Sequence, residues 1–202
     1  GGDLLRVDDR LLMSLPIERL EPVGIAGAAH LDAVDVHRVA RRRERRAASA
    51  VRLAFDELDV ATASTRAARI ALDEGLQGAA GDAQRRARLS YEDALSLAAT
   101  ARLGVALAKS ELELARLRTA LAWEEARLAD ARVEFAKGFA LDGIALPPSR
   151  AVALADLEQQ VEHHADEVRR ANRRLSSARV EMQHARDAHD RAIARARLTH
   201  GR

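Results

Sequence analysis

Small apolar residues recur at alternating intervals of four and three residues between about residues 83 and 142, and a second apolar series runs beside them. In a helix with a heptad repeat each series forms a continuous face, and the two faces lie roughly 150° apart. A helix of a simple bundle needs only one apolar face, about 100° wide or slightly more. The two series therefore predict one of two arrangements. Either this helix lies in the middle of a flat layer of three helices, or one of its faces contacts another molecule.

We call the two patterns the alanine series and the leucine series. The alanine series comprises Ala87, Tyr91, Ala94, Ala98, Ala101, Val105, Ala108, Leu112, Ala115, Thr119, Ala122, Ala126, Ala129, Val133, Ala136 and Ala140. The leucine series comprises Leu103, Leu107, Leu114, Leu117, Leu121, Leu128 and Phe135. An uninterrupted heptad pattern of this length is typical of a coiled coil.

Helix breakers divide the chain into three periodic segments, which we predict to be helices at about residues 30–77, 83–142 and 150–198. Gly78 is a typical helix end, and Asp82 is a typical cap for the helix that follows. The run "PPS" before residue 150 prevents the second helix from continuing into the third. Because short connections between long helices favour antiparallel neighbours, the predicted fold class is all-α: an elongated antiparallel coiled-coil bundle of three long helices.

Residues 1–29 have a different pattern, with Pro16, Pro22 and the glycine-containing stretch "VGIAGAA". The leucines of this segment make it apolar enough to pack on or near the bundle, and we expect a short helix that ends before Pro16. The predicted organisation is therefore an N-terminal segment and linker at residues 1–29, followed by a three-helix elongated coiled-coil domain at residues 30–202.

The first long helix also carries a weaker apolar stripe opposite its main seam, made of Leu53, Val60, Ala63, Ala67 and Ile70. A flat layer of three helices would leave this stripe exposed, and a long exposed apolar stripe is typical of an association site. We therefore predict a homo-oligomer, in the first instance a dimer, built along the first two helices. The leucine series is its predicted self-association seam.

The composition supports long helices rather than a compact globule. Hydrophobic residues make up 48% of the 202-residue chain and aromatic residues only 2%, so alanine, leucine and valine must fill the interior. Charged residues make up 32%, and the abundance of Ala, Leu, Arg and Glu is typical of coiled coils. The chain has no cysteine, which excludes a disulfide framework and a thiolate metal site.

The basic residues are almost all arginine, although the formal net charge is only +2. Folding the chain back twice brings three arginine-rich stretches level with one another, and their guanidinium groups suit phosphate or carboxylate ligands. The predicted anionic-surface contact consists of Arg41, Arg42, Arg43, Arg45, Arg46, Arg116, Arg118, Arg169, Arg170, Arg173 and Arg174. The plainer interpretation is that these are solvated residues in scattered ion pairs, each of which contributes little.

No motif predicts catalysis. Glu181 and His184 have the Glu-x-x-His spacing of di-iron bundles, but such sites need a second copy of the motif and further inward glutamates. His163, His164 and His189 fit surface or seam-edge positions better than metal ligands. The chain also has no glycine-rich phosphate loop and no nucleophile elbow. We therefore expect no enzyme activity, no cofactor, no metal and no small-molecule substrate.

In its proportions the chain resembles membrane-shaping BAR-type modules, which also use three long helices, homodimerise and present cationic surfaces. This resemblance implies a structural or scaffolding protein: a self-associating helical rod that contacts an anionic surface, in the first instance a membrane. The alternative is a bacterial envelope coiled-coil chaperone or adaptor that binds other proteins. A third interpretation, nucleic-acid compaction, depends wholly on the arginines.

Two further features bear on the alternative and on location. The stretch "VEFAKGFALDGIALPPSRAVALADLEQQ" resembles the helix-gap-helix passages of outer-membrane efflux factors, although the β-strand segments of those proteins are absent. No apolar run approaches the roughly 18–20 residues that span a bilayer. The chain opens on "GGDLLRV", which allows for a targeting segment that has been removed. We expect the bacterial cell envelope, periplasmic and lipid-anchored through such a segment, ahead of the cytoplasm.

Overall fold

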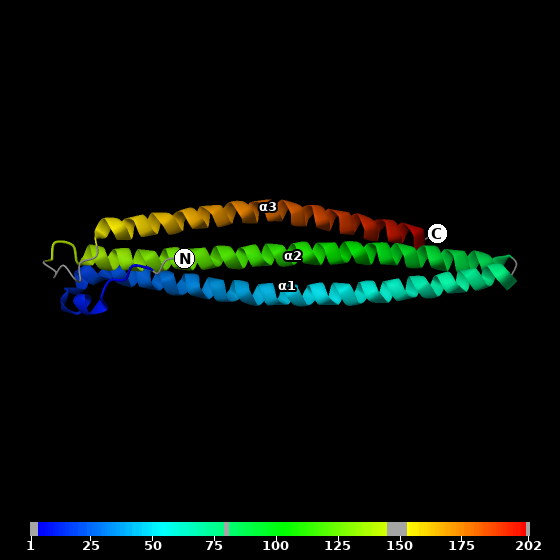
Figure 1. Cartoon of the computed structure of the whole chain (residues 1–202), viewed down its shortest axis with the longest axis horizontal. Coiled ribbons are helices and arrows are strands. Elements are labelled where there is room, and N and C mark those ends of the chain that lie inside the picture. The colour runs from blue at the N-terminus through cyan, green and yellow to red at the C-terminus, as the bar shows by residue number, and fades with distance from the viewer. Residues whose placement is uncertain (1–3, 79–80, 145–152, 201–202) are drawn as a thin grey trace. The chain divides into compact units, whose positions relative to one another are not determined.

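The structure is a computed structural model that describes residues 4–78, 81–144 and 153–200. A short 3₁₀ helix, η1 (Asp9–Ser14), precedes three long α-helices: α1 (Ile17–Gly78), α2 (Asp82–Ala140) and α3 (Leu154–His200) (Figure 1). The described residues contain no strand, and the three long helices pack against each other. The predicted all-α class with three long helices is therefore confirmed. The predicted start of the third helix, near residue 150, lies outside the described residues.

The first long helix begins at Ile17 rather than near His30, so the predicted linker at the end of residues 1–29 is wrong. The stretch "VGIAGAA" is helical, and Pro22 lies inside α1. Pro22 lies in the second turn, so α1 lacks the one hydrogen bond that a backbone N–H at residue 22 would donate to the Glu18 carbonyl oxygen. The Arg19 guanidinium also donates to the carbonyl oxygens of Ala140 (3.3 Å) and Asp142 (3.1 Å). These contacts satisfy carbonyl groups at the end of α2 and hold the first turns of α1 beside them.

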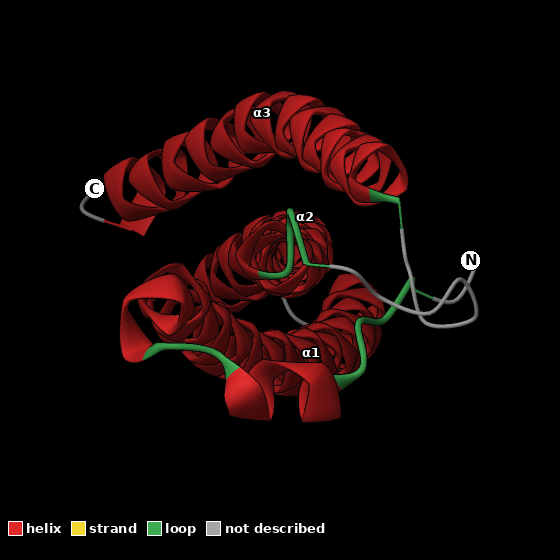
Figure 2. Ribbon diagram, turned by 90° about the vertical axis from the view of Figure 1, so that its left-hand side faces the viewer, coloured by secondary structure: helices red, strands yellow, loops and turns green. Residues whose placement is uncertain are grey.

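The chain divides into two units that each contain a segment of every long helix. Unit 1 comprises residues 1–43 and 116–176, and unit 2 comprises residues 44–115 and 177–202. Within each unit, the α2 segment lies between the α1 and α3 segments (Figures 1 and 2). This is the middle position that the two apolar series allow for, and it gives α2 an internal neighbour on both sides.

In unit 2 the side-chain contacts show that neighbouring helices run antiparallel. Between α1 and α2, the Thr65 hydroxyl donates to the Ala94 carbonyl oxygen at 3.0 Å, and the Lys109 ammonium lies 5.0 Å from the centre of the Phe55 ring. Between α2 and α3, Arg186 Nη2 donates to Glu111 Oε1 at 3.0 Å, and His189, further along α3, lies beside Gly104, earlier on α2. Ala87 of the alanine series also lies beside Gly75 of α1, so the alanine series of α2 faces α1.

In unit 1 the N-terminal segment packs on the bundle, as predicted. Val7 is buried in one cluster with Leu141 and Leu157. Partly buried side chains pack around this cluster: Leu11, Leu12, Leu15 and Phe135. The cluster joins the N-terminal segment to the ends of α2 and α3 that lie nearest to it.

Gly138 lies at a close contact between α2 and α3 in unit 1. A Cβ atom at this position would lie 2.5 Å from Leu157 Cδ1, and the Leu157 side chain is fully buried. Gly104, on the same helix in unit 2, is different, because a Cβ atom there would meet nothing closer than His189 Nε2 at 3.5 Å. One glycine is therefore required by packing, whereas the other is not.

We predict that Gly138→Ala destabilises the protein and that Gly104→Ala does not. Overpacking at a buried contact costs about 1–3 kcal/mol, which exceeds the roughly 0.5–1 kcal/mol that alanine contributes over glycine inside a helix. Urea unfolding followed by circular dichroism measures both variants. A stability gain for Gly138→Ala equal to that for Gly104→Ala would contradict the close packing of α2 on α3.

Candidate functional site

The leucine series of α2, predicted to be a self-association seam, packs inside the described chain. Its face turns toward α3: Glu111, on the same side of the helix, binds Arg186, and Phe135 packs on the cluster that contains Leu157. Leu114 is only 4% exposed. The other members are partly buried: Leu103, Leu107, Leu117, Leu121, Leu128 and Phe135. The assignment to a contact between copies is therefore corrected, because the middle position of α2 directs this face to a helix of its own chain.

The weaker stripe on α1 is an apolar face that remains uncovered in unit 2. Leu53, Val60 and Ile70 are 63%, 71% and 59% exposed, and Ala63 and Ala67 are also exposed. We call these residues, with the charged positions among them, the outer face of α1. The opposite side of the helix carries partly buried residues that face α2: Val51, Ala54, Leu58, Ala61, Thr65, Ala68 and Leu72. The uncovered stripe is thus a candidate association surface.

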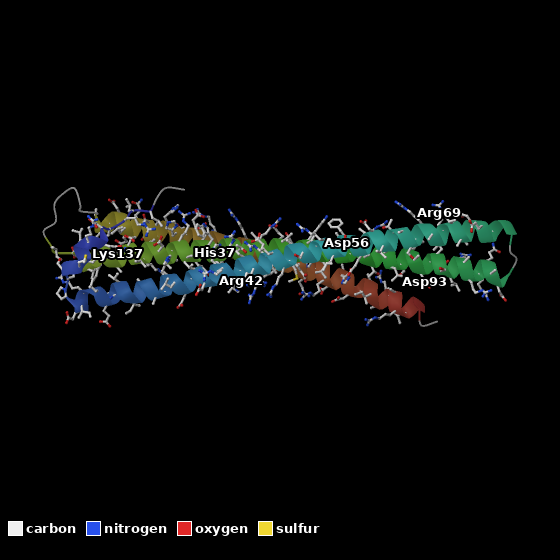
Figure 3. The ribbon with its side chains drawn as sticks, turned by 90° about the horizontal axis from the view of Figure 1, so that it is seen from below. His37, Arg42, Asp56, Arg69, Asp93 and Lys137 are labelled. Atoms are coloured by element: carbon white, nitrogen blue, oxygen red, sulfur yellow. The ribbon has the colours of Figure 1, made fainter. Side chains whose placement is uncertain are left out.

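The five arginines of the run Arg41–Arg46 on α1 are exposed. Arg41, Arg42 and Arg43 belong to unit 1, and Arg45 and Arg46 belong to unit 2. No ion pair among the described residues involves any of these five side chains. Arg42 is labelled on the α1 ribbon in Figure 3. These guanidinium groups are therefore available to an anionic ligand.

The other six predicted arginines all belong to unit 1, and four of them already interact with other residues of the chain. On α3, Arg169 pairs with Asp166, and Arg170 pairs with Glu167. The hydrogen bond from Arg170 lowers the pKa of Glu167, so that this carboxylate stays charged beside it. Further residues of the predicted set are Arg116 and Arg173, which also interact within the chain, and Arg118 and Arg174, which are exposed. The basic surface is therefore concentrated on α1.

A buried carboxylate that the sequence did not reveal anchors the N-terminal segment. Glu134 is fully buried; it accepts hydrogen bonds from the Val7 backbone N–H (2.7 Å), Arg6 Nη1 (3.0 Å) and Lys137 Nζ (3.0 Å). Arg6 also forms a bidentate pair with Asp130 at 2.8 and 2.7 Å. A buried charge of this kind is stable only when it is paired and hydrogen-bonded. Its role is structural, since every partner belongs to the chain itself.

The same network shifts the pKa of both of its cations. Hydrogen bonding to Asp130 raises the pKa of Arg6, against the effect of partial burial. Burial alone would lower the pKa of Lys137, but hydrogen bonds to Asp9 and Glu134 outweigh it and raise the pKa. Both side chains therefore remain charged and hold the segment near η1 against α2. The only sequence signal was the spacing of Asp130, Glu134 and Lys137, which places them on one helix face.

His164 is the most buried histidine of the described chain, at 3% exposed, and lines a pocket between α2 and α3 in unit 1. The pocket has a volume of about 690 Å³ and is lined by Leu4, Leu5, Glu124, Arg127, Asp156, Gln159, Gln160, His163, His164 and Glu167. His164 Nδ1 has no hydrogen-bond partner in the described chain. Burial lowers the pKa of His164, and the nearby charge of Arg127 adds to this effect.

The structure gives no constellation for metal-dependent chemistry in the described residues. No group of three or more histidine, cysteine, aspartate or glutamate side chains is placed to hold a metal ion there. Glu181 and His184 are both exposed, while Met182 between them is partly buried. His189 is partly buried beside Gly104, and His163 is exposed. Within residues 4–78, 81–144 and 153–200, no helix has a stretch apolar enough to cross a bilayer.

Comparison with protein-family models, with curated proteins and with solved structures finds no match to this chain. Function must therefore be inferred from the surfaces themselves.

We predict that His164 makes the protein less stable in mild acid. The pKa of His164 is lowered on folding, so the unfolded chain binds a proton more readily than the folded one. Its contribution is fully present above the unfolded pKa of about 6.5 and decreases as the pH falls through that value. The free energy of unfolding, measured with urea at about pH 7.5 and about pH 5, should therefore be lower at the acid pH.

The variant His164→Asn should show a smaller difference between the two pH values, because its side chain does not titrate. His184→Asn is the matched control, since His184 is exposed on the same helix. An equal pH dependence in the wild type and in His164→Asn would rule out His164 as the source of the acid sensitivity.

Proposed function

We propose that the protein is a non-enzymatic structural protein, a helical scaffold that associates with itself and contacts an anionic membrane surface. The observation that carries this proposal is the outer face of α1. Leu53, Val60 and Ile70 remain exposed there, although the three long helices pack against each other within the chain. An apolar stripe of this kind is costly in water and is typical of a protein interaction site. Self-association is therefore assigned to α1 and no longer to the leucine series of α2.

The proposed anionic contact rests on the run Arg41–Arg46. Its arginines are exposed and have no ion-pair partner in the described chain, and a single glutamate, Glu44, interrupts them. Guanidinium groups bind phosphate in a bidentate manner. Each basic residue near an anionic leaflet contributes about 1 kcal/mol to membrane binding. A run of this length is thus sufficient for a reversible, salt-dependent contact.

A phospholipid surface suits this run better than single-stranded nucleic acid does. Proteins that bind single strands combine basic grooves with aromatic platforms for the bases, and aromatic residues make up only 2% of this chain. The Trp123 ring is already in contact with His37, with ring centroids 5.3 Å apart, and Tyr91 is partly buried. We therefore expect the arginine run to contact phosphate groups electrostatically, without aromatic stacking on bases.

A second candidate function, an adaptor that binds other proteins, is supported by a separate groove in unit 2. It lies where α1 and α2 approach their connection, has a volume of about 960 Å³, and exposes Leu76, Leu89 and Leu95 on its walls. A groove with an apolar lining between two helices is a common binding site for a third, amphipathic helix. This candidate predicts a protein ligand in place of a lipid.

We expect co-sedimentation with vesicles that contain phosphatidylserine and none with neutral phosphatidylcholine vesicles. The triple variant Arg41→Gln, Arg42→Gln, Arg43→Gln should reduce this binding by about a hundredfold, because each arginine contributes about 1 kcal/mol and about 1.4 kcal/mol corresponds to a factor of ten. A matched control removes three other exposed arginines, from α3: Arg179→Gln, Arg191→Gln and Arg197→Gln.

Binding that is equal for neutral and anionic vesicles, or an equal loss in both triple variants, would contradict the proposed contact. Salt-sensitive binding to duplex DNA without any vesicle response would favour nucleic-acid compaction. Binding to another protein without a response to lipid or DNA would favour the adaptor.

A further inference from the structure

The outer face of α1 in unit 2 has the repeat of a coiled-coil seam. Leu53, Val60 and Ala67 follow one another at intervals of seven residues and form one row. A second row, offset by three residues, consists of Asp56, Ala63 and Ile70. Two such rows are the a and d positions of a heptad, the positions that face a partner helix in a coiled coil. All six residues are exposed, and α1 uses the opposite side for α2.

We propose that this face binds the same face of a second copy of the chain, antiparallel, around a two-fold axis that passes between Ala61 and Thr62. In this register Leu53 lies opposite Ile70 of the second copy, and Val60 lies opposite Ala63 of the second copy. Contacts of this kind are reciprocal, so the association closes at a dimer. This inference rests on the self-association part of the proposed function, to which it adds the contact face and the register of the two copies.

Charge complementarity fixes this register. A third row lies beside the first, one residue earlier in the sequence, and its charges alternate in sign. Its four members are all exposed: Arg52, Asp59, Arg66 and Asp73. In an antiparallel coiled coil they are g positions, and g positions face each other across the seam. Arg52 then faces Asp73 of the second copy, and Asp59 faces Arg66 of the second copy. By symmetry each attractive pair forms twice, and no like charges meet along this edge.

The same residues argue against a parallel dimer. In a parallel arrangement every seam residue meets its own counterpart, so Asp56 would face Asp56 of the second copy within the apolar seam. In the antiparallel register Asp56 faces Ala67 of the second copy, where its carboxylate reaches water at the edge. A parallel dimer would keep one attraction, between Arg52 and Glu57, but Asp59 would face Ser64. The like-charge contact thus selects the antiparallel arrangement.

The aspartates also identify the occupant as a protein rather than a membrane. Asp56, Asp59 and Asp73 offset the three arginines of this face, so the face has no net positive charge to attract an anionic leaflet. Asp56 and Arg69 are labelled on this part of α1 in Figure 3. Arg69 lies 3.8 Å from Asp73 on the same exposed surface, a weak pair that a second copy can replace. The membrane contact proposed above therefore uses the arginine run, and the outer face is left for a second copy.

A charge-reversal cycle tests the register. Asp59→Arg and Arg66→Asp should each raise the dimer dissociation constant, measured by sedimentation equilibrium, by roughly tenfold, since each creates two repulsive contacts by symmetry. The double variant should return to the wild-type value, because the reversed charges again attract each other across the two copies. Residues seven positions apart on one helix are about 10 Å apart along the axis, too far for a pair within one chain. Arg86→Asp, exposed on α2, is the matched control and should change nothing.

A second measurement uses the absence of cysteine from the sequence. Single cysteines introduced at Ala63 and at Leu76 carry spin labels, and the label-to-label distance within the dimer is measured. We expect a short distance at residue 63 and a distance on the order of 40 Å at residue 76. Short distances at both positions would demonstrate a parallel dimer and overturn the inference.

The outcomes separate this inference from the proposed function. A dimer that is unaffected by both charge reversals would overturn the proposed face while leaving self-association in place. A wild type that stays monomeric at every concentration would overturn both. Circular dichroism of each variant verifies that the helices are intact, as expected for substitutions at exposed positions.

Discussion

The structure depends on one constraint, which is that α2 must bury apolar side chains on two faces roughly 150° apart. The alanine series meets α1, as the hydrogen bond between Thr65 and Ala94 illustrates, and the leucine series turns toward α3. The α3 side carries most of the large side chains, with Gly138 at a point of close contact with Leu157, and the α1 side carries mostly alanine. Because both faces need a neighbour, α2 takes the middle position and α1 and α3 become outer helices.

The outer position of α1 has consequences for its exposed side. An outer helix needs one apolar face, and the inner side of α1 supplies it through residues such as Leu58 and Leu72. Leu53, Val60 and Ile70 are therefore in excess of what the fold of one chain requires. The dimer that we propose uses this excess, and the alternating charges beside it set the proposed register. The proposed anionic contact uses the arginines that begin at Arg41, so the two proposals concern different parts of α1.

Much of the fold was predictable because the spacing of apolar residues along the chain indicates helices directly. The three helices and the end of α1 at Gly78 follow from local signals that the structure confirms, whereas Asp82 is the first residue of α2 and the Gly81 carbonyl accepts the first hydrogen bond of that helix. The start of α1 was not predictable, because Pro22 and the neighbouring glycines are usual signs of a linker. Arg19, in the first turn of α1, binds the carbonyl groups at the end of α2, a contact distant in sequence that no local pattern indicates.

The candidate surfaces were predictable only in part, for a related reason. Heptad positions give the angle between two faces of a helix but do not say which neighbour each face meets, so the leucine series was assigned to a second copy. The exposed stripe on α1 was identified correctly because it lies opposite a stronger seam. The buried Glu134 was missed, since its partners Arg6 and Val7 lie far away in the sequence and a glutamate in a charged helix is normally solvated.

The most direct test of the middle position of α2 is the stability of Leu114→Glu compared with that of Leu53→Glu. Leu114 is buried inside one chain, so we predict that its substitution lowers the free energy of unfolding by about 3 kcal/mol or more. Leu53 is exposed, and its substitution should change the value by no more than about 0.5 kcal/mol. If Leu114→Glu keeps its helix content and its unfolding free energy and loses only its ability to associate, the leucine face is not internal and the arrangement described for α2 is wrong.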